Sequence, residues 1–375
     1  MDEMPVILVI GSGVIGARVF YDLAQTPRSR VLHLLGRNVD QVVESANLAR
    51  FSALQRGIRQ DVSYSVSDLE DVDRTAEIIS RVHPDVIFLA VSRQSWRVIT
   101  TLPRPYAEAL AEANFGPWLP MHLAPVTAAM MAVRAASSDA VVVNAAFPDA
   151  VHPALRDAGL SPHVGIGNVA NNVPALRTIA AQRLGCDLDE IHLRLVAHHY
   201  ASFRMRHGHT GSAPVGFTVS RSATDVTAQA PLEALLGPLS GEYRRAGGLA
   251  GQAMVSAAAL SVIEPIVDRT RAYVHGPGPA GLPGGYPLLI EDGQISLDLP
   301  PGMSEADAVS INTQGQVHDG ISRIEDGYIY FEESTMDVMR RHLGYYCAKT
   351  HWSEAGDWAV ELGRRFRGYR AREKI

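Results

Sequence analysis

The sequence opens with an apolar run that leads directly into three closely spaced glycines, V-I-L-V-I-G-S-G-V-I-G, at residues 6–16. Val6–Ile10 is continuous and rich in β-branched residues, which is typical of a strand buried on both faces of a parallel sheet. Residues 17–23 then have the pattern of a helix. A strand, a G-x-G-x-x-G turn and a helix in this order predict a cradle for a dinucleotide.

Each glycine of the turn has a separate physical role. Gly11 permits the tight turn, Gly13 lets the backbone approach a pyrophosphate, and Gly16 lets the helix pack closely on the strand. The N-terminus of the helix adds free N–H groups and a partial positive charge that attract phosphates. We therefore expect a cofactor to bind along the whole loop, which consists of Gly11, Ser12, Gly13, Val14, Ile15 and Gly16.

The second expected strand, at residues 31–35, ends in Gly36, Arg37 and Asn38. An NAD site usually carries an acidic residue there, which bonds to the ribose hydroxyls. A carboxylate would repel a 2′-phosphate, whereas Arg37 can form charge-assisted hydrogen bonds to it. The sequence therefore favours NADP as the cofactor over NAD, with these three residues in its binding site.

Strands and helices alternate over the rest of the first half. Helices are expected at Val72–Val82 and 122–136, and the segment 102–118, rich in proline and aromatic residues, is expected to form a loop over the cofactor. The remaining strands are expected at 62–66, 86–91 and 140–144, and a further strand at 164–168 is expected after Pro162. This alternation predicts an α/β fold with a doubly wound parallel sheet. Ligands bind at the carboxyl ends of such strands, which assigns Ala90, Val91 and Asn144 to the cofactor.

The length and charge of the chain limit what it can do. A chain of 375 residues suits two domains and an appendage, expected at 1–160, 161–325 and 326–375. The net charge of −6 includes no basic block, so we expect no nucleic-acid partner. Two cysteines without paired spacing exclude a disulfide framework. No apolar run has membrane-spanning length and no leader is evident, so we expect a cytoplasmic protein.

The second half contains a helix, a strand and a pair of histidines in close succession. The helix, at residues 173–184, ends in Leu-Gly and is followed by a strand at 191–196 and the run A-H-H-Y. This order resembles the lactate and malate dehydrogenases. Residues 251–266 resemble the long substrate-domain helix of that family, and G-G-Y-P-L-L-I-E-D-G-Q-I-S-L-D-L-P at 284–300 resembles its late β-hairpin. The resemblance covers residues 5–320. It implies a C-terminal α/β substrate domain of lactate/malate dehydrogenase type and a homodimer or homotetramer.

The resemblance also implies a mechanism in which a nicotinamide exchanges a hydride with a carbonyl or alcohol carbon. The catalytic histidine of the family falls on His199, and a histidine suits proton transfer because its usual pKa lies near working pH. The aspartate that orients it falls on Asn172, an amide that cannot stabilise an imidazolium by charge. The family arginine that binds the substrate carboxylate falls on Ala175. The substrate is therefore expected to differ from lactate and malate.

Other cations have to replace that arginine if the substrate is an anion. Arg93 is the best placed, because it follows the carboxyl end of an expected strand. The other candidates are Arg97, Arg177 and Arg204. His207 and His209 could face one side of a strand as metal ligands do, but no cysteine or carboxylate cluster accompanies them, so we expect no metal.

These observations predict an NADP-dependent oxidoreductase that transfers a hydride to or from a carbonyl or alcohol centre of a small, specialised substrate. Three alternatives remain open. The G-R-N run resembles saccharopine-reductase-type cofactor domains, which would imply an imine or aldehyde reductase. The NAD-dependent glycosidases, a sister branch of the dehydrogenases, would imply an internal-redox lyase or glycosidase. Asn172 and Ala175 also permit a nucleotide-binding protein without catalysis.

Overall fold

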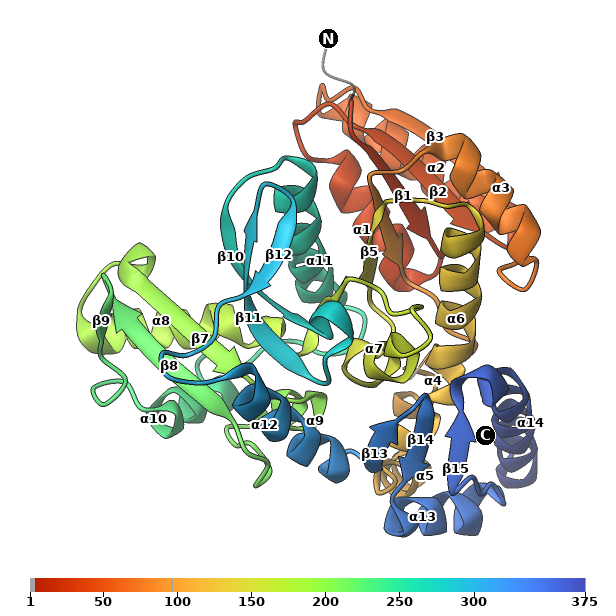
Figure 1. Ribbon diagram of the computed structural model, residues 1–375. Helices are drawn as coiled ribbons and strands as arrows, with labels where there is room; N and C mark the ends of the chain where they lie inside the picture. Colours follow the sequence, from red (N-terminus) through yellow and green to blue (C-terminus); the bar gives the residue numbers. More distant parts are fainter. Residues whose placement is uncertain (1–3, 96, 375) are drawn as a thin grey trace.

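The computed structural model describes residues 4–95 and 97–374 (Figure 1). Its centre is a six-stranded parallel sheet in the order β3-β2-β1-β4-β5-β6. The strands are β1 (Val6–Ile10), β2 (Val31–Gly36), β3 (Asp61–Val66), β4 (Val86–Leu89), β5 (Val141–Asn144) and β6 (Val164–Gly165). The apolar run at the start of the chain forms β1, which pairs with both β2 and β4. The doubly wound sheet expected from the sequence is confirmed.

Helices cover both faces of this sheet, and alternate residues of β1 show how. Ile7 and Val9 belong to one hydrophobic core, together with buried residues of α1 (Val14–Ala24) and α2 (Val39–Gln55). Leu8 and Ile10 belong to another, together with residues of the helices on the opposite face, α3 (Val72–Val82), α6 (Pro120–Ala135) and α7 (Pro148–Arg156). A strand buried on both faces needs an apolar residue at every position, as this one has.

The second half of the chain consists of two small antiparallel sheets and the helices beside them. The sheets are β7 (Ile191–Val196), β8 (Gly216–Arg221) and β9 (Thr224–Asp225), and β10 (Ala272–Pro277), β11 (Gly285–Glu291) and β12 (Gln294–Leu297). The helices are α8 (Val173–Leu184), α9 (His199–Met205), α10 (Leu232–Leu236), α11 (Gln252–Val267) and α12 (Glu305–His318). Because α11 packs against α1, this half shares a core with the parallel sheet.

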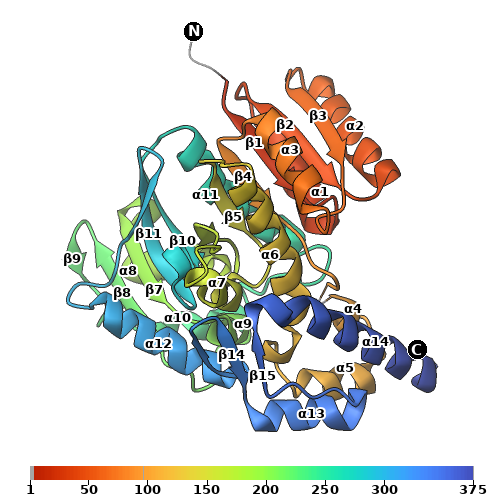
Figure 2. The ribbon, with the colours of Figure 1, turned by 45° about the vertical axis from the view of Figure 1, so that its right-hand side comes forward.

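The C-terminal segment forms a third small sheet with two helices. It consists of β13 (Ile321–Glu325), β14 (Tyr328–Phe331), α13 (Glu333–Leu343), β15 (Lys349–His351) and α14 (Ala355–Glu373). Helix α14 runs beside α6, as Figure 2 shows. Buried residues of the segment, such as Met336 and Phe366, share one core with α6 and α7. The segment is therefore an integral part of the N-terminal half.

Two segments differ from their expected structure. Residues 102–118 do not form a loop over the cofactor site but contain α5 (Arg104–Ala111), which packs on α13. Leu102, Leu110 and Trp118 of this segment are buried in the core. The strand expected after Pro162 is only β6, because Gly167 and Asn168 adopt positive φ angles of 79° and 48° and turn the chain into a 3₁₀ helix.

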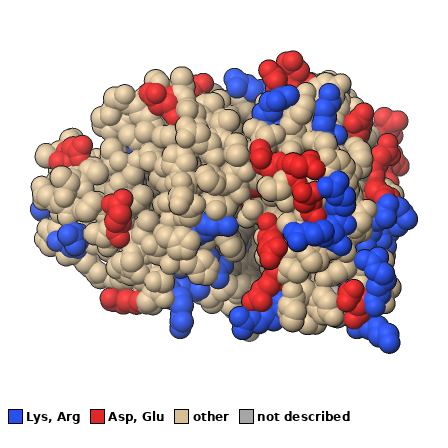
Figure 3. Space-filling view, turned by 90° about the horizontal axis from the view of Figure 1, so that it is seen from below, with Lys and Arg blue, Asp and Glu red and all other residues tan. Residues whose placement is uncertain are grey.

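The surface carries its charges unevenly. On the face shown in Figure 3, acidic and basic side chains gather over the right-hand half and are sparse over the left-hand half. Both signs are mixed there, so this face presents no large field of a single sign. Each helix formed by the described residues is too short or too polar to cross a bilayer.

Candidate functional site

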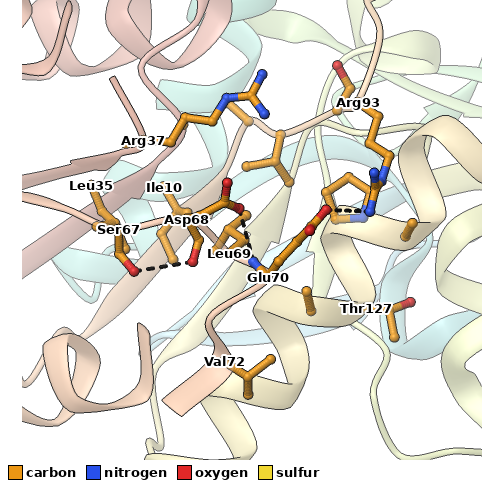
Figure 4. Close-up of a pocket in the computed structure, with 18 of the residues that line it drawn as sticks. Ile10, Leu35, Arg37, Ser67, Asp68, Leu69, Glu70, Val72, Arg93 and Thr127 are labelled. Carbon is orange, nitrogen blue, oxygen red and sulfur yellow. Dashed lines mark hydrogen bonds and ion pairs between the residues drawn. The ribbon is translucent and has the colours of Figure 1, made fainter. Parts of the chain in front are cut away.

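A cavity of about 420 Å³ lies at the carboxyl ends of the first strands of the parallel sheet (Figure 4). It is the place where open α/β sheets bind ligands. Of the residues assigned to a site from the sequence, its lining includes Gly11, Ser12, Gly13, Gly36, Arg37, Ala90, Val91 and Arg93. The first glycine-rich turn therefore opens onto a space large enough for part of a dinucleotide.

The glycine turn has the close packing that its spacing predicts. Gly11 has a φ of 114°, and a Cβ atom at Gly16 would overlap the carbonyl oxygen of Gly11. A Cβ atom at Gly13 would meet nothing within 4 Å, so the backbone there is open to a ligand. Val14 is exposed, and Ile15 packs against the core. Within the described part of the chain, Val14, Ile15 and Gly16 do not line the cavity.

A side chain at position 36, where the acidic residue of an NAD site would stand, would have to displace its neighbours. A Cβ atom at Gly36 would lie 2.6 Å from the Ser12 hydroxyl oxygen and 2.7 Å from a methyl group of Val42. Arg37 is exposed, and Figure 4 shows its guanidinium above the cavity. Asn38 instead begins α2, where its side-chain oxygen accepts a hydrogen bond of 3.0 Å from the Gln41 N–H.

Arg93 lies in the cavity but is already engaged. Its guanidinium forms an ion pair with Glu70, which belongs to the loop after β3 (Figure 4). Both side chains are partly exposed, so exchanging this pair for contacts with a ligand costs little free energy. Arg93 thus belongs to the cavity at the glycine turn, whereas His199 is not among the described residues that line it.

His199 lies at the start of α9 and is held by two carboxylates. Its Nδ1 is 2.7 Å from an oxygen of Asp319, and its backbone N–H donates a hydrogen bond of 2.8 Å to Asp149. Asp149 also accepts a hydrogen bond from the Asn168 amide. Asp319 follows α12 and Asp149 lies in the first turn of α7, so the fold joins three distant segments here.

The protonation of this pair follows from its surroundings. Burial by itself would lower the pKa of His199, but the charge and hydrogen bond of Asp319, with a further contribution from Asp149, raise that pKa above its usual value. Burial likewise opposes the ionisation of Asp319, yet His199 keeps the pKa of the carboxyl below its usual value. The imidazole can therefore hold a proton more readily than an ordinary histidine and release it to an acceptor.

Sequence reasoning had missed both carboxylates. Asp149 did carry a signal, because it stands in N-A-A-F-P-D directly after β5, where ligand-binding residues of α/β sheets lie. Asp319 carries none, since it lies 120 residues from His199 and has no motif around it.

Two amides assigned to the site are used within the protein. The buried Asn172 donates a 2.9 Å hydrogen bond to the Ser202 carbonyl and accepts one of 2.6 Å from Arg245. The fully buried Asn144 accepts a 2.9 Å hydrogen bond from the Ala146 N–H and donates to that residue's carbonyl. Both side chains thus stabilise loops around the site, and the ring partner of His199 is Asp319.

Aromatic side chains border the His199 ring. The centroids of Phe115 and Phe147 lie 5.0 and 5.5 Å from it, and Phe203 stacks at 6.3 Å. Phe147 has φ 44° and ψ 55°, a left-handed conformation that bulky residues adopt only under strain and that often marks functional sites. His122, 5.2 Å from Phe115, is held neutral because burial lowers its pKa to about 4.

The candidate cations differ in their contacts. Arg177 donates to the main-chain carbonyls of Ile191 and Leu188, and the side chain of Arg97 lies outside the described residues. Arg204 packs on the Tyr200 ring with its guanidinium carbon 3.4 Å from the ring centroid, and its charge opposes the protonation of His199.

No group of three or more His, Cys, Asp or Glu side chains in the described part of the chain is arranged to hold a metal ion, His207 and His209 included.

The sequence matches no family model, and no curated protein is significantly similar to it. Solved structures do share the fold. The lactate dehydrogenase from Cryptosporidium parvum, complexed with lactic acid and nicotinamide adenine dinucleotide, has a TM-score of 0.57 at 17% identity over 85% of this chain and 99% of that one. The malate dehydrogenase from Aeropyrum pernix has a TM-score of 0.54 at 14% identity over 83% and 95%.

The malate dehydrogenase from Salinibacter ruber has the same TM-score of 0.54, with 14% identity over 90% of this chain and 98% of that one. These similarities confirm the architecture expected from the sequence, a Rossmann domain followed by a C-terminal α/β domain of lactate/malate dehydrogenase type.

Proposed function

We propose that this protein is an NADP-dependent oxidoreductase that transfers a hydride to or from a carbonyl or alcohol centre of a small molecule. The observation that carries the proposal is the pairing of His199 with the buried Asp319, with Nδ1 and a carboxylate oxygen 2.7 Å apart, in a chain that also has a dinucleotide cradle. A histidine whose pKa is raised by a specific partner is a typical acid–base catalyst.

The positions of the two features on the sheet support a common site. Phe147 and Asp149 follow β5, and the cavity-lining residues Ala90 and Val91 follow β4, its parallel neighbour. A dinucleotide in a doubly wound sheet extends from the first mononucleotide half, around β1 and β2, into the second half around β4 and β5. The His199 pair therefore lies beside the half that would receive the nicotinamide.

Each group of the pair has a definite task in such a reaction. The bound nicotinamide would supply or accept the hydride. His199, protonated because of Asp319, donates its proton to the developing alkoxide oxygen of a carbonyl substrate and takes it back in the reverse direction. Asp319 stabilises the imidazolium and fixes the orientation of the ring, as a carboxylate orients a catalytic histidine in other enzymes. Asp149 holds the backbone of His199 in place.

The preference for NADP rests on the end of β2. Gly36 leaves no room for a carboxylate, and the guanidinium of Arg37 extends over the cavity, where it would bind a 2′-phosphate. NAD, lacking that phosphate, would lose this contact. Arg204 is the candidate cation for an anionic substrate group. The same proposal includes assembly into a homodimer or homotetramer and a cytoplasmic location. It also includes domain boundaries at residues 160 and 325.

The test measures coenzyme binding and turnover separately. Titration with NADPH and NADH gives the two dissociation constants, and a panel of ketones, aldehydes and imines is then assayed for oxidation of NADPH. We expect tighter binding of NADPH and net oxidation with at least one class of carbonyl. Turnover without net oxidation would favour the internal-redox alternative. Binding without turnover of any substrate would favour a nucleotide-binding protein, and binding of neither coenzyme would refute the proposal.

A further inference from the structure

The cavity at the glycine turn has a wall that comes from the other end of the chain. Besides the residues of the parallel sheet and α6, its lining includes Trp352, Ser353 and Gly356. They lie at the junction of β15 and α14, beyond residue 320, where the sequence resemblance to the dehydrogenases ends. The Cryptosporidium parvum structure matches over 99% of its own length but only 85% of this chain, so this chain is the longer of the two.

Trp352 is held firmly in this wall. The residue before it, His351, pairs with Tyr328 in the sheet of β14 and β15. The main-chain N–H of Trp352 donates a hydrogen bond of 3.0 Å to the Gly327 carbonyl. The indole is partly buried and packs against Gly327, where a Cβ atom would lie 3.1 Å from the indole nitrogen. The orientation of the ring is therefore set before any ligand binds.

Other lining residues of the same cavity indicate which part of a dinucleotide would meet the indole. They include Gly36 at the end of β2, Arg37 after it and residues 67–70 after β3. These strand ends belong to the half of the sheet formed by β3, β2 and β1, which is one of the two mononucleotide-binding halves. The residue at the end of β2 contacts the adenosine ribose in such sites. The adenosine part of a bound coenzyme would therefore share this cavity with Trp352.

We infer that Trp352 contacts the adenine ring of the bound coenzyme and that the C-terminal segment is a built-in wall of the coenzyme site. This inference rests on the proposed function, because it requires a dinucleotide in the cavity. An indole offers a flat apolar face to a nucleobase, and such stacking is tolerant of small shifts of either ring. Trp352 is thus a coenzyme-binding residue outside the dehydrogenase fold proper.

Removal of the whole segment would not test this inference, because Leu362 and Phe366 share a core with α6. Point variants do test it. Trp352→Ala is compared with Trp358→Ala, a matched control on α14 whose ring makes an edge-on contact with Tyr345 at 5.9 Å. The described residues that line the cavity do not include Trp358. Circular dichroism and the thermal midpoint establish that each variant is folded.

The measured quantities are the dissociation constants for NADPH and for ADP, which has the adenine but lacks the nicotinamide. Trp352→Ala is expected to raise both about tenfold, the usual effect of losing one aromatic contact to a base. Trp358→Ala is expected to leave both unchanged within error. An unchanged affinity of Trp352→Ala for NADPH would overturn the inference. A loss for NADPH without a loss for ADP would also overturn it, because the indole would then not contact the adenine.

A second pair of variants adds bulk instead of removing it. A Cβ atom at Gly356 or at Gly368 would meet nothing within 4 Å, and both residues lie in α14, but only Gly356 lines the cavity. Gly356→Phe should therefore weaken the binding of NADPH and ADP at least as much as Trp352→Ala, and Gly368→Phe should not change it. Equal affinities of these two variants would contradict a coenzyme site at this wall.

Titration of the wild-type protein distinguishes a failure of the proposed function from a failure of the inference about Trp352. If the wild-type protein binds neither NADPH nor NADH, the proposed function is wrong. If it binds NADPH while Trp352→Ala and Gly356→Phe bind equally well, the proposed function stands and the inference about Trp352 is wrong.

Discussion

Replacement of Asp319 by asparagine is the sharpest test of the His199 pair. The substitution removes one negative charge and keeps the size of the side chain, so that the amide oxygen can still accept a hydrogen bond from Nδ1. In the wild-type protein the carboxylate is 2.7 Å from Nδ1 and its side chain is only 3% exposed. The loss of its charge therefore leaves a largely buried imidazole without the group that stabilises its protonated form.

The size of the effect follows from electrostatics. Two charges about 4 Å apart interact by about 4 kcal/mol at the effective dielectric constant of roughly 20 that describes such sites. Burial acts against this attraction, so the net rise in the pKa of His199 is smaller than the attraction alone would give. Since the pKa of His199 is now raised, we expect Asp319→Asn to lower it below its usual value.

The assay is the pH dependence of kcat/KM for carbonyl reduction. Reduction requires protonated His199, so the rate is high at low pH and falls as the pH rises through the pKa of His199. In Asp319→Asn this fall should move to lower pH, with turnover at neutral pH reduced about a hundredfold. Asp298→Asn is the matched control, because Asp298 also pairs with a histidine, at 2.6 Å, away from the site.

An Asp319→Asn profile that coincides with the wild-type profile would refute the reasoning, since His199 would then not depend on the carboxylate. The pair also contributes to stability, and its two members do so in different ranges of pH. The raised pKa of His199 contributes stability that is fully present below the unfolded pKa and is lost as the pH rises through the folded pKa. The lowered pKa of Asp319 contributes stability that is lost as the pH falls through it.

Three further substitutions test the proposal. His199→Ala should reduce turnover at least about a hundredfold and leave the dissociation constant for NADPH nearly unchanged, because the side chain transfers a proton and does not hold the nucleotide; equal turnover, measured at saturating coenzyme, would exclude the proposed role. Arg37→Asp should shift the ratio of kcat/KM values from NADP toward NAD, since a carboxylate repels a 2′-phosphate and binds ribose hydroxyls; an unchanged ratio would show that Arg37 does not select the coenzyme. Gly36→Asp should lower the free energy of unfolding by about 1–3 kcal/mol instead of creating an NAD site, because its Cβ atom would lie 2.6 Å from the Ser12 hydroxyl oxygen. If denaturant titration showed the variant to be as stable as the wild type, that packing would be contradicted.

Prediction from sequence succeeded where the signal is local. The run V-I-L-V-I-G-S-G-V-I-G shows a buried strand, a tight turn and a helix within a few residues, and the structure contains these elements in that order. It failed where the backbone changes conformation at single residues. Gly167 and Asn168 interrupt an expected strand, and residues 104–111 form a helix that packs on the C-terminal segment.

In the candidate site too, residues with a local signal were predicted and residues brought together by long-range contacts were not. Gly11 and Gly13 of the glycine turn and Gly36 and Arg37 of the G-R-N run line the cavity, because each acts through its own backbone or through its position at a strand end. Gly16 and Asn38, predicted from the same motifs, are not among the described lining residues. The partner of His199 was assigned by counting to Asn172, whose amide instead bonds to Ser202 and Arg245. Asp319 takes that place because α12 ends beside α9, a contact between helices that no sequence periodicity encodes.

The sequence by itself determined the parallel sheet and its nucleotide cradle, since buried strands and glycine turns depend on hydrophobicity and backbone sterics over neighbouring residues. Only the tertiary structure decided that Asp319 raises the pKa of the His199 imidazole and that Trp352 borders the cradle. Electrostatic and stacking contacts act between side chains a few ångströms apart in space, and the folded chain brings these side chains together from segments that lie far apart along it.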